Sequence, residues 1–247
     1  MARVDVYGDA SALLDAAADV VAEIAAASVA ARGRVTLALS GGSTPRGLYQ
    51  RLAGAWHDRV DWTRVHVFWG DERCVPPTHA DSNYRLAREA LLDHVPIPPL
   101  HIHRMHGEAN PDAAALDYEA ILKATLDDAS SGRPGAFDLV LLGLGPDGHT
   151  ASLFPHRATG DETRRLVVAD RPDAARGWRL TLTPQVLNAA RQTLMLVAGT
   201  DKADALAAVL EGPPNAEHLP AQRFTGSHVR WMVDQAAARL LRSSPRG

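Results

Sequence analysis

Residues 143–155 read GLGPDGHTASLFP and follow the apolar run FDLVLL at 137–142. A short apolar run that ends at a glycine predicts a buried strand. The glycines after it let the backbone turn tightly and come close to a ligand. In open parallel sheets, ligands bind in the crevice outside the carboxyl ends of the strands. The stretch therefore predicts a turn that presents Asp147 and His149 at a ligand-binding edge of a sheet.

Strand and helix patterns alternate through the rest of the chain. Further strands are predicted at 3–7, 34–40, 65–69, 166–169, 179–183, 193–198 and 229–233. Helices are predicted at 9–31, 45–52, 81–92, 111–129, 203–210 and 235–241, with a short helix after 183 and a turn at 130–135. This alternation predicts an α/β fold, with a doubly wound, mostly parallel, Rossmann-like sheet flanked by helices on both faces. Without an internal repeat or a long linker, we expect residues 1–247 to form one domain.

The composition is that of an ordinary globular protein. The 247 residues are 46% hydrophobic and 22% charged, with a net charge of −3. Because no basic tail is present, nucleic acid is not an expected partner. The alanine-rich segment 10–31 carries Asp15, Asp19 and Glu23, which indicates a helix in water rather than a membrane span. The single cysteine, Cys74, permits no intramolecular disulfide, so we expect a packed thiol and a cytoplasmic protein.

A second glycine turn, SGGST at 40–44, follows a predicted strand and leads into a helix. Free backbone N–H groups, hydroxyls and the positive end of a helix together favour an anion. Thr44 is also the predicted N-cap of this helix, with Pro45 at its first position. The motif G-x-x-x-x-G-K-[ST] is absent, so a nucleoside triphosphate is not indicated. The turn therefore predicts a site for a small anion.

A third turn, GDER at 70–73, follows the next predicted strand. The simplest explanation of its charges is an exposed ion pair, which contributes little to stability. A sugar phosphate would give them other roles, because the Asp71 carboxylate accepts hydroxyl protons and Arg73 offers a planar fork to phosphate. Arg179 and Lys202 adjoin two further strands. Each alone is best explained as a solvated surface charge, whereas a phosphate ligand would give both of them a role at the same edge.

Two other motifs are discounted. The glycines at 143–148 form a literal G-x-G-x-x-G, but Pro155 interrupts the long helix that dinucleotide binding requires. The histidines of H-x-H-x-x-H at 101–106 lie in a proline-rich loop with Glu108 as the nearest carboxylate, which is a poor set of metal ligands. We therefore expect neither a nucleotide cofactor nor a bound metal.

Five segments carry a family resemblance: LALSGGSTP at 37–45, FWGDERCVPPTHADSN at 68–83, GLGPDGHTASLFP at 143–155, RLTLTPQVLNAA at 179–190 and VAGTDKADAL at 197–206. Taken in this order, they resemble the 6-phosphogluconolactonase family. DGHTASLFP is the most specific segment, whereas SGGSTP is shared with related sugar-phosphate isomerases and deaminases. The resemblance implies a doubly wound α/β fold and hydrolysis of 6-phosphoglucono-δ-lactone without metal or cofactor, in the oxidative pentose phosphate pathway.

The resemblance also implies that His149 takes the proton from the attacking water, and an imidazole that titrates near neutrality suits that role. Asp147 is expected to orient His149, to hold a substrate hydroxyl or to satisfy the turn. The residues expected to bind the substrate and its phosphate are Gly41, Gly42, Ser43, Thr44, Arg73, Arg179 and Lys202.

Two alternative functions stay open. An aldose–ketose isomerase or deaminase for amino-sugar 6-phosphates would use the same phosphate turn, with Asp71 as the catalytic base. A non-catalytic sugar-phosphate sensor would bind similar ligands, but the sequence shows no DNA-binding helix pair, and DGH would then have no role. The oligomeric state is left open.

Overall fold

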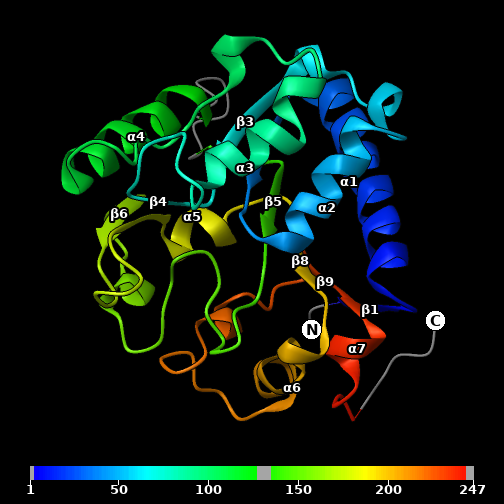
Figure 1. Ribbon diagram of the computed structural model, residues 1–247, viewed down its shortest axis with the longest axis vertical. Coiled ribbons are helices and arrows are strands. Elements are labelled where there is room, and N and C mark those ends of the chain that lie inside the picture. The colour runs from blue at the N-terminus through cyan, green and yellow to red at the C-terminus, as the bar shows by residue number, and fades with distance from the viewer. Residues whose placement is uncertain (1–2, 127–134, 243–247) are drawn as a thin grey trace.

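The computed structural model describes residues 3–126 and 135–242 (Figure 1). At its centre is a six-stranded sheet in which all neighbouring strands are parallel, in the order β1-β9-β8-β5-β2-β3. The strands are β1 (Arg3–Tyr7), β2 (Val35–Leu39), β3 (Val65–Trp69), β5 (Leu139–Leu142), β8 (Thr193–Val197) and β9 (Val229–Asp234). The predicted α/β class and parallel sheet are confirmed.

Helices cover both faces of this sheet, as predicted. One face packs against α1 (Ala10–Arg32), α2 (Ser43–Ala53) and α3 (Asn83–Ala90), and the other against α4 (Pro111–Leu126), α5 (Pro184–Asn188), α6 (Ala203–Glu211) and α7 (Gln235–Ala238). Short 3₁₀ segments lie at His57–Arg59, Trp62–Arg64, Leu92–His94, Pro99–His101, Ala158–Asp161, Thr200–Lys202 and Pro220–Arg223. None of the helices in the described ranges has the length and hydropathy that crossing a bilayer requires.

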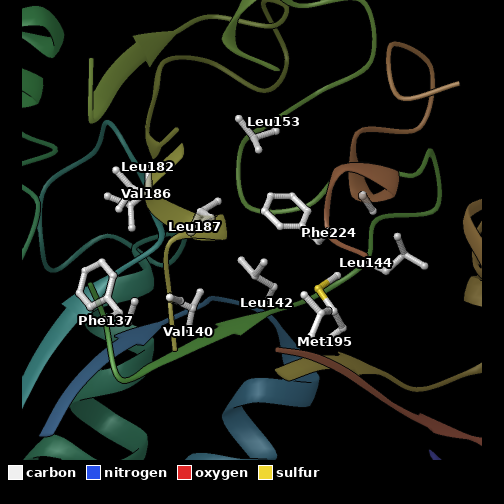
Figure 2. Close-up of a cluster of buried hydrophobic side chains, with 14 of the residues drawn as sticks. Phe137, Val140, Leu142, Leu144, Leu153, Leu182, Val186, Leu187, Met195 and Phe224 are labelled. Carbon is white, nitrogen blue, oxygen red and sulfur yellow. The ribbon is translucent and has the colours of Figure 1, made fainter. Parts of the chain in front are cut away.

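Side chains of β5 alternate between two hydrophobic cores. Leu139 and Leu141 are buried on the side of α1 and α2, whereas Val140 and Leu142 are buried on the side of α5 and α6. Figure 2 shows the second core, in which Leu142 lies near Met195 of β8 and Val140 lies between Leu142 and Phe137. Burial on both faces explains why the strand reads as an unbroken apolar run.

The order of the strands reverses between β2 and β5. From β2 the chain continues to its neighbour β3, and from β5 it continues to β8 on the opposite side. A crevice forms at the carboxyl ends of the strands where such a reversal occurs. The turns 40–44 and 143–149 leave these two strands, so the fold brings the two predicted ligand turns to one place.

A second sheet, which the sequence did not predict, continues from the carboxyl end of β3. It is antiparallel, in the order β4-β7-β6, with β4 (Asp71–Arg73), β7 (Arg179–Leu182) and β6 (Val167–Asp170). Of the predicted turn at 70–73, only Gly70 precedes the strand, and the other three residues form β4. Gly70 links the sheets, because its N–H donates to the Leu39 carbonyl at 2.8 Å and its carbonyl accepts the Leu182 N–H at 2.8 Å.

The two predicted helix caps have different outcomes. Ser82 caps α3, since its hydroxyl accepts the Arg85 N–H at 3.1 Å. Thr44 does not cap α2, because the helix begins two residues earlier than predicted, at Ser43, and Gly42 occupies the N-cap position with φ of 107° and no side-chain bond. This left-handed backbone conformation favours glycine. The predicted end of a helix at 129 and most of the predicted turn at 130–135 lie outside the described residues.

The motif H-x-H-x-x-H at 101–106 covers the outer edge of the parallel sheet. Its backbone pairs with the edge strand β3, where the His103 N–H donates to the Val67 carbonyl at 2.8 Å. His101 and His103 stack on His66, with ring centroids 3.9 and 5.5 Å away. Within the described ranges, no three His, Cys, Asp or Glu side chains are arranged to hold a metal ion. Their observed role is to pack and cover the sheet edge.

This stack is expected to make the stability of the protein sensitive to acid. Burial, with His101 and His103 nearby, lowers the pKa of His66 to about 4, against about 6.5 in an unfolded chain. The unfolded state then binds the proton more readily, so the stabilisation is complete above about pH 6.5 and is lost as the pH falls toward 4. Because the ring is only half-buried, we expect the free energy of unfolding to fall by about 1 kcal/mol between pH 7 and pH 5.

Urea unfolding at several pH values measures this dependence. Burial also lowers the pKa of His103, so His66→Gln should reduce the slope between pH 7 and pH 5 without abolishing it, whereas the exposed His106→Gln should keep it in full. An equal slope in the wild type and in His66→Gln would contradict the assignment.

Candidate active site

The crevice at the strand reversal is an open cleft of about 210 Å³. Six of the predicted site residues line it: Gly41, Gly42, Asp71, Arg73, His149 and Lys202. The other four are not lining residues but adjoin them in the chain or by pairing: Asp147 binds His149, Ser43 and Thr44 follow Gly42 in α2, and Arg179 pairs with Arg73 across β4 and β7. The structure therefore gathers the residues that the sequence singled out from segments far apart in the chain.

His149 lies in the turn after β5, with its ring on the wall of the cleft. Its Nδ1 hydrogen-bonds Asp147 Oδ1, and its ring packs against Phe154 with centroids 4.6 Å apart. The bond to His149 lowers the pKa of Asp147, so the carboxylate is an anionic acceptor and Nδ1 carries the proton. Among the described residues, no hydrogen bond engages Nε2. This nitrogen is therefore able to accept a proton from a molecule in the cleft.

The turn that carries His149 rests on the hydrophobic core. Leu144 and Leu153, at its two ends, are buried with Phe224, as Figure 2 shows. Two glycines then close it: the Gly145 N–H donates to the His149 carbonyl at 2.8 Å, and the Gly148 N–H donates to the Gly145 carbonyl at 3.0 Å. A side chain at Gly145 has no room, since its Cβ would lie 2.0 Å from His149 Nδ1.

Gly145→Ala should therefore displace the imidazole, while Gly143→Ala should not, because a Cβ at Gly143 would meet nothing within 4 Å. A displacement of about 1 Å at a reacting group can cost about 10²-fold in rate, so we expect a loss of that order in kcat for Gly145→Ala. Because both substitutions lie in the same turn, the kcat values of the two variants for lactone hydrolysis measure the effect of displacing His149. Equal activity of both variants would show that the glycine does not position His149.

Asp71 presents a buried carboxylate to the cleft. It accepts the Ser152 hydroxyl at 2.7 Å and the Asn83 amide at 3.3 Å, and Asn83 also donates to the Asp71 carbonyl at 2.9 Å. Gly41 makes this arrangement possible, because a Cβ there would lie 1.8 Å from Asn83 Oδ1. Sequence reasoning assigned no role to Asn83 or Ser152. Each reads as an ordinary loop or cap residue, and only the fold brings Ser152, 81 residues away, to Asp71.

The neighbouring Glu72 has a different role from Asp71. Its carboxylate accepts the backbone N–H groups of Asn83 and Tyr84 at 2.7 and 2.8 Å, so it closes the N-terminus of α3. Burial raises the pKa of Glu72, against the opposing effect of these hydrogen bonds. In GDER, therefore, Asp71 faces the cleft and Glu72 organises the helix beside it.

Positive charge gathers on one side of the cleft. Arg73 and Arg179 face each other across β4 and β7, and Arg73 donates from Nη1 to the Asp81 carbonyl at 2.6 Å. Burial and the proximity of Arg73 lower the pKa of Arg179, and none of the described hydrogen bonds or ion pairs involves the Arg179 side chain. Lys202 Nζ lies 3.1 Å from Asp201 and also lines the cleft. Two arginines at paired positions of neighbouring strands, with neither guanidinium in a described ion pair, form a natural site for an anion.

Fold and site define an α/β protein whose switch-point cleft combines a histidine–aspartate pair with a binding site for an anionic ligand. The family model described as glucosamine-6-phosphate isomerases/6-phosphogluconolactonase matches residues 8–233, and the chain belongs to this family. It is 41% identical to the 6-phosphogluconolactonase of Mycobacterium leprae, covering 96% of this chain and 97% of that protein. It is also 41% identical to the enzyme of that name from Synechocystis, over 97% and 98% of the two chains.

Solved structures show the same relationship. The 6-phosphogluconolactonase from Trypanosoma cruzi superposes with a TM-score of 0.85 at 30% identity, covering 98% of each chain. A structure described as devB protein gives the same TM-score at 34% identity and covers 98% of this chain and all of its own. The resemblance read from the five sequence segments is thereby confirmed.

Proposed function

We propose that this chain hydrolyses 6-phospho-D-glucono-1,5-lactone to 6-phosphogluconate, a step of the oxidative pentose phosphate pathway. The observation that carries the proposal is the His149–Asp147 pair, which leaves Nε2 of a cleft-lining imidazole without a described partner. Relatives that match nearly the full chain at 41% identity bear the name 6-phosphogluconolactonase, which supports the same reaction.

The chemistry needs a positioned base. The carbonyl of a δ-lactone is already electrophilic, so His149 Nε2 removes a proton from water as the water oxygen attacks C1. The resulting tetrahedral oxyanion is stabilised by donors of the turn 143–149 or by a cation of the cleft, and Asp147 stabilises the imidazolium. When the bond from C1 to the ring oxygen breaks, the imidazolium returns its proton to that oxygen. His149 is then neutral again, and the new carboxylic acid releases its proton to solvent.

The phosphate anchors the sugar away from C1. Arg73 and Arg179 are cross-strand neighbours of like charge, and a dianion between them would replace repulsion with charge-assisted hydrogen bonds. Lys202 and the glycine turn at the N-terminus of α2 provide further positive potential on the cleft wall. Binding energy at the phosphate then orients the lactone carbonyl toward His149.

The isomerase or deaminase alternative would use Asp71 as its base. Both oxygens of the Asp71 carboxylate are already engaged, one by the Ser152 hydroxyl at 2.7 Å and the other by the Asn83 amide at 3.3 Å. By contrast, none of the described hydrogen bonds engages Nε2 of His149. The geometry therefore favours water activation by His149, and the sensor alternative leaves the His149–Asp147 pair without a use.

Acid release from freshly prepared 6-phosphogluconolactone, followed in a pH-stat, tests the proposal. The protein should increase the rate well above the spontaneous opening of the lactone. Ammonia release from glucosamine 6-phosphate measured in parallel would indicate the deaminase instead. Binding of 6-phosphogluconate without any acceleration of lactone opening would support the sensor.

A further inference from the structure

The loop 171–178, which precedes β7, ends beside the His149–Asp147 pair. From this loop, Arg176 Nη2 donates to Asp147 Oδ2 at 2.9 Å. His149 binds the other oxygen, Oδ1. The Asp147 carboxylate is therefore shared between an imidazole and a guanidinium, with one oxygen bound to each.

Arg176 is held through both its side chain and its backbone. Its guanidinium lies over the Phe154 ring, 4.6 Å from the centroid, and the same ring packs against His149. Its backbone N–H donates to the Asp173 carboxylate at 2.7 Å, and its Nη1 lies 3.7 Å from the same carboxylate. Gly177, with φ of 66°, turns the chain and donates to the Asp173 carbonyl at 3.1 Å. Exposed ion pairs contribute little to stability when their long side chains move freely. The side chain of Arg176 is 41% exposed, but it is stacked on Phe154 and its backbone is hydrogen-bonded.

We propose that Arg176 is a positioning residue for His149 and acts through Asp147. By binding Oδ2, Arg176 holds the carboxylate so that Oδ1 stays with Nδ1 and Nε2 stays turned toward the cleft. Its positive charge also offsets part of the negative charge that Asp147 places beside the imidazole. A general base must be unprotonated before it acts, which gives Arg176 a role in catalysis beyond stability. This inference rests on the proposed lactone hydrolysis.

Other charged groups face the same cleft. Asp71, Arg73 and Lys202 line it together with His149. Within the described part of the chain, none of the three forms a hydrogen bond or ion pair with His149 or Asp147. Removing Arg176 therefore changes the charge next to the Asp147 carboxylate while these other groups stay in place.

An NMR titration of the His149 imidazole tests the inference, with His149→Gln used to identify the resonance. Arg176→Gln removes the charge, and the local bond between Asp147 and His149 should persist. We expect the pKa of His149 to rise by about half a unit in Arg176→Gln. Arg176→Lys keeps the charge and should shift it by less than half as much. The matched control Arg171→Gln, at an exposed arginine of the same loop, should leave it unchanged.

Kinetics add a second readout. The acidic limb of the pH profile of kcat/KM should move to higher pH by the same half unit in Arg176→Gln, with kcat about three- to tenfold lower at neutral pH. A pKa of His149 that stays constant or falls in Arg176→Gln overturns the inference, even if thermal stability drops. The titration needs no substrate. A wild-type protein that fails to accelerate lactone opening would therefore contradict the proposed function without affecting the link between Arg176 and His149.

Discussion

Replacement of His149 by alanine should lower kcat for 6-phosphogluconolactone hydrolysis by about 10²–10⁴-fold, with little change in KM. The reason is that the imidazole interacts with the water rather than with the phosphate that anchors the sugar. Its loss removes an interaction made in the transition state and leaves ground-state binding intact. Initial rates of acid release at saturating and subsaturating lactone, corrected for spontaneous opening, separate the two parameters.

Asp147→Asn is the informative companion variant. It keeps the size of the side chain but removes the negative charge that favours the Nδ1–H tautomer and stabilises the imidazolium. A smaller loss than in His149→Ala is therefore expected. Turnover close to that of the wild type in folded His149→Ala would remove this imidazole from the mechanism, whatever Asp147→Asn shows.

Much of the fold could be predicted because its signals are local. Apolar runs such as 137–142 mark strands buried on both faces, and glycines mark the turns that follow them. Once the strands are parallel, the turns after β2 and β5 must emerge at the same edge, which places Gly41 and His149 on one cleft. The segment DGHTASLFP could carry the family resemblance because it is also a local signal, in which Asp147 and His149 lie two residues apart.

The antiparallel sheet and several contacts in the site could not be predicted, because they depend on residues far apart in the sequence. The antiparallel sheet arises because Gly70 hydrogen-bonds residues 39 and 182 at once, so that Arg179 meets Arg73. In a parallel strand, Arg179 would have begun at the amino edge, far from the cleft. Ser152 and Arg176 were missed because their partners lie 81 and 29 residues away.

Arg179→Ala should raise KM for the phosphorylated lactone by about 100-fold, because two charge-assisted hydrogen bonds to a dianion contribute roughly 3 kcal/mol. The same variant should leave kcat/KM for unphosphorylated gluconolactone within about twofold. It should also not destabilise the ligand-free protein, since the Arg179 side chain has no described hydrogen-bond or ion-pair partner and faces the like charge of Arg73. Kinetics on the two lactones and a thermal melt with and without inorganic phosphate measure these three effects.

Arg179 is a cleaner position for this test than Arg73, because Arg73 also donates to the Asp81 carbonyl at 2.6 Å and its removal would disturb the segment before α3. Arg85→Ala supplies the control. Arg85 pairs with Glu89 on α3 and lies outside the cleft lining, and because it donates to the Thr78 carbonyl at 3.1 Å, it also shows the effect of disturbing the segment before α3. Phosphate should stabilise the wild type and Arg85→Ala more than Arg179→Ala. Equal losses on both lactones would mean that Arg179 supports the shape of the cleft and does not bind phosphate.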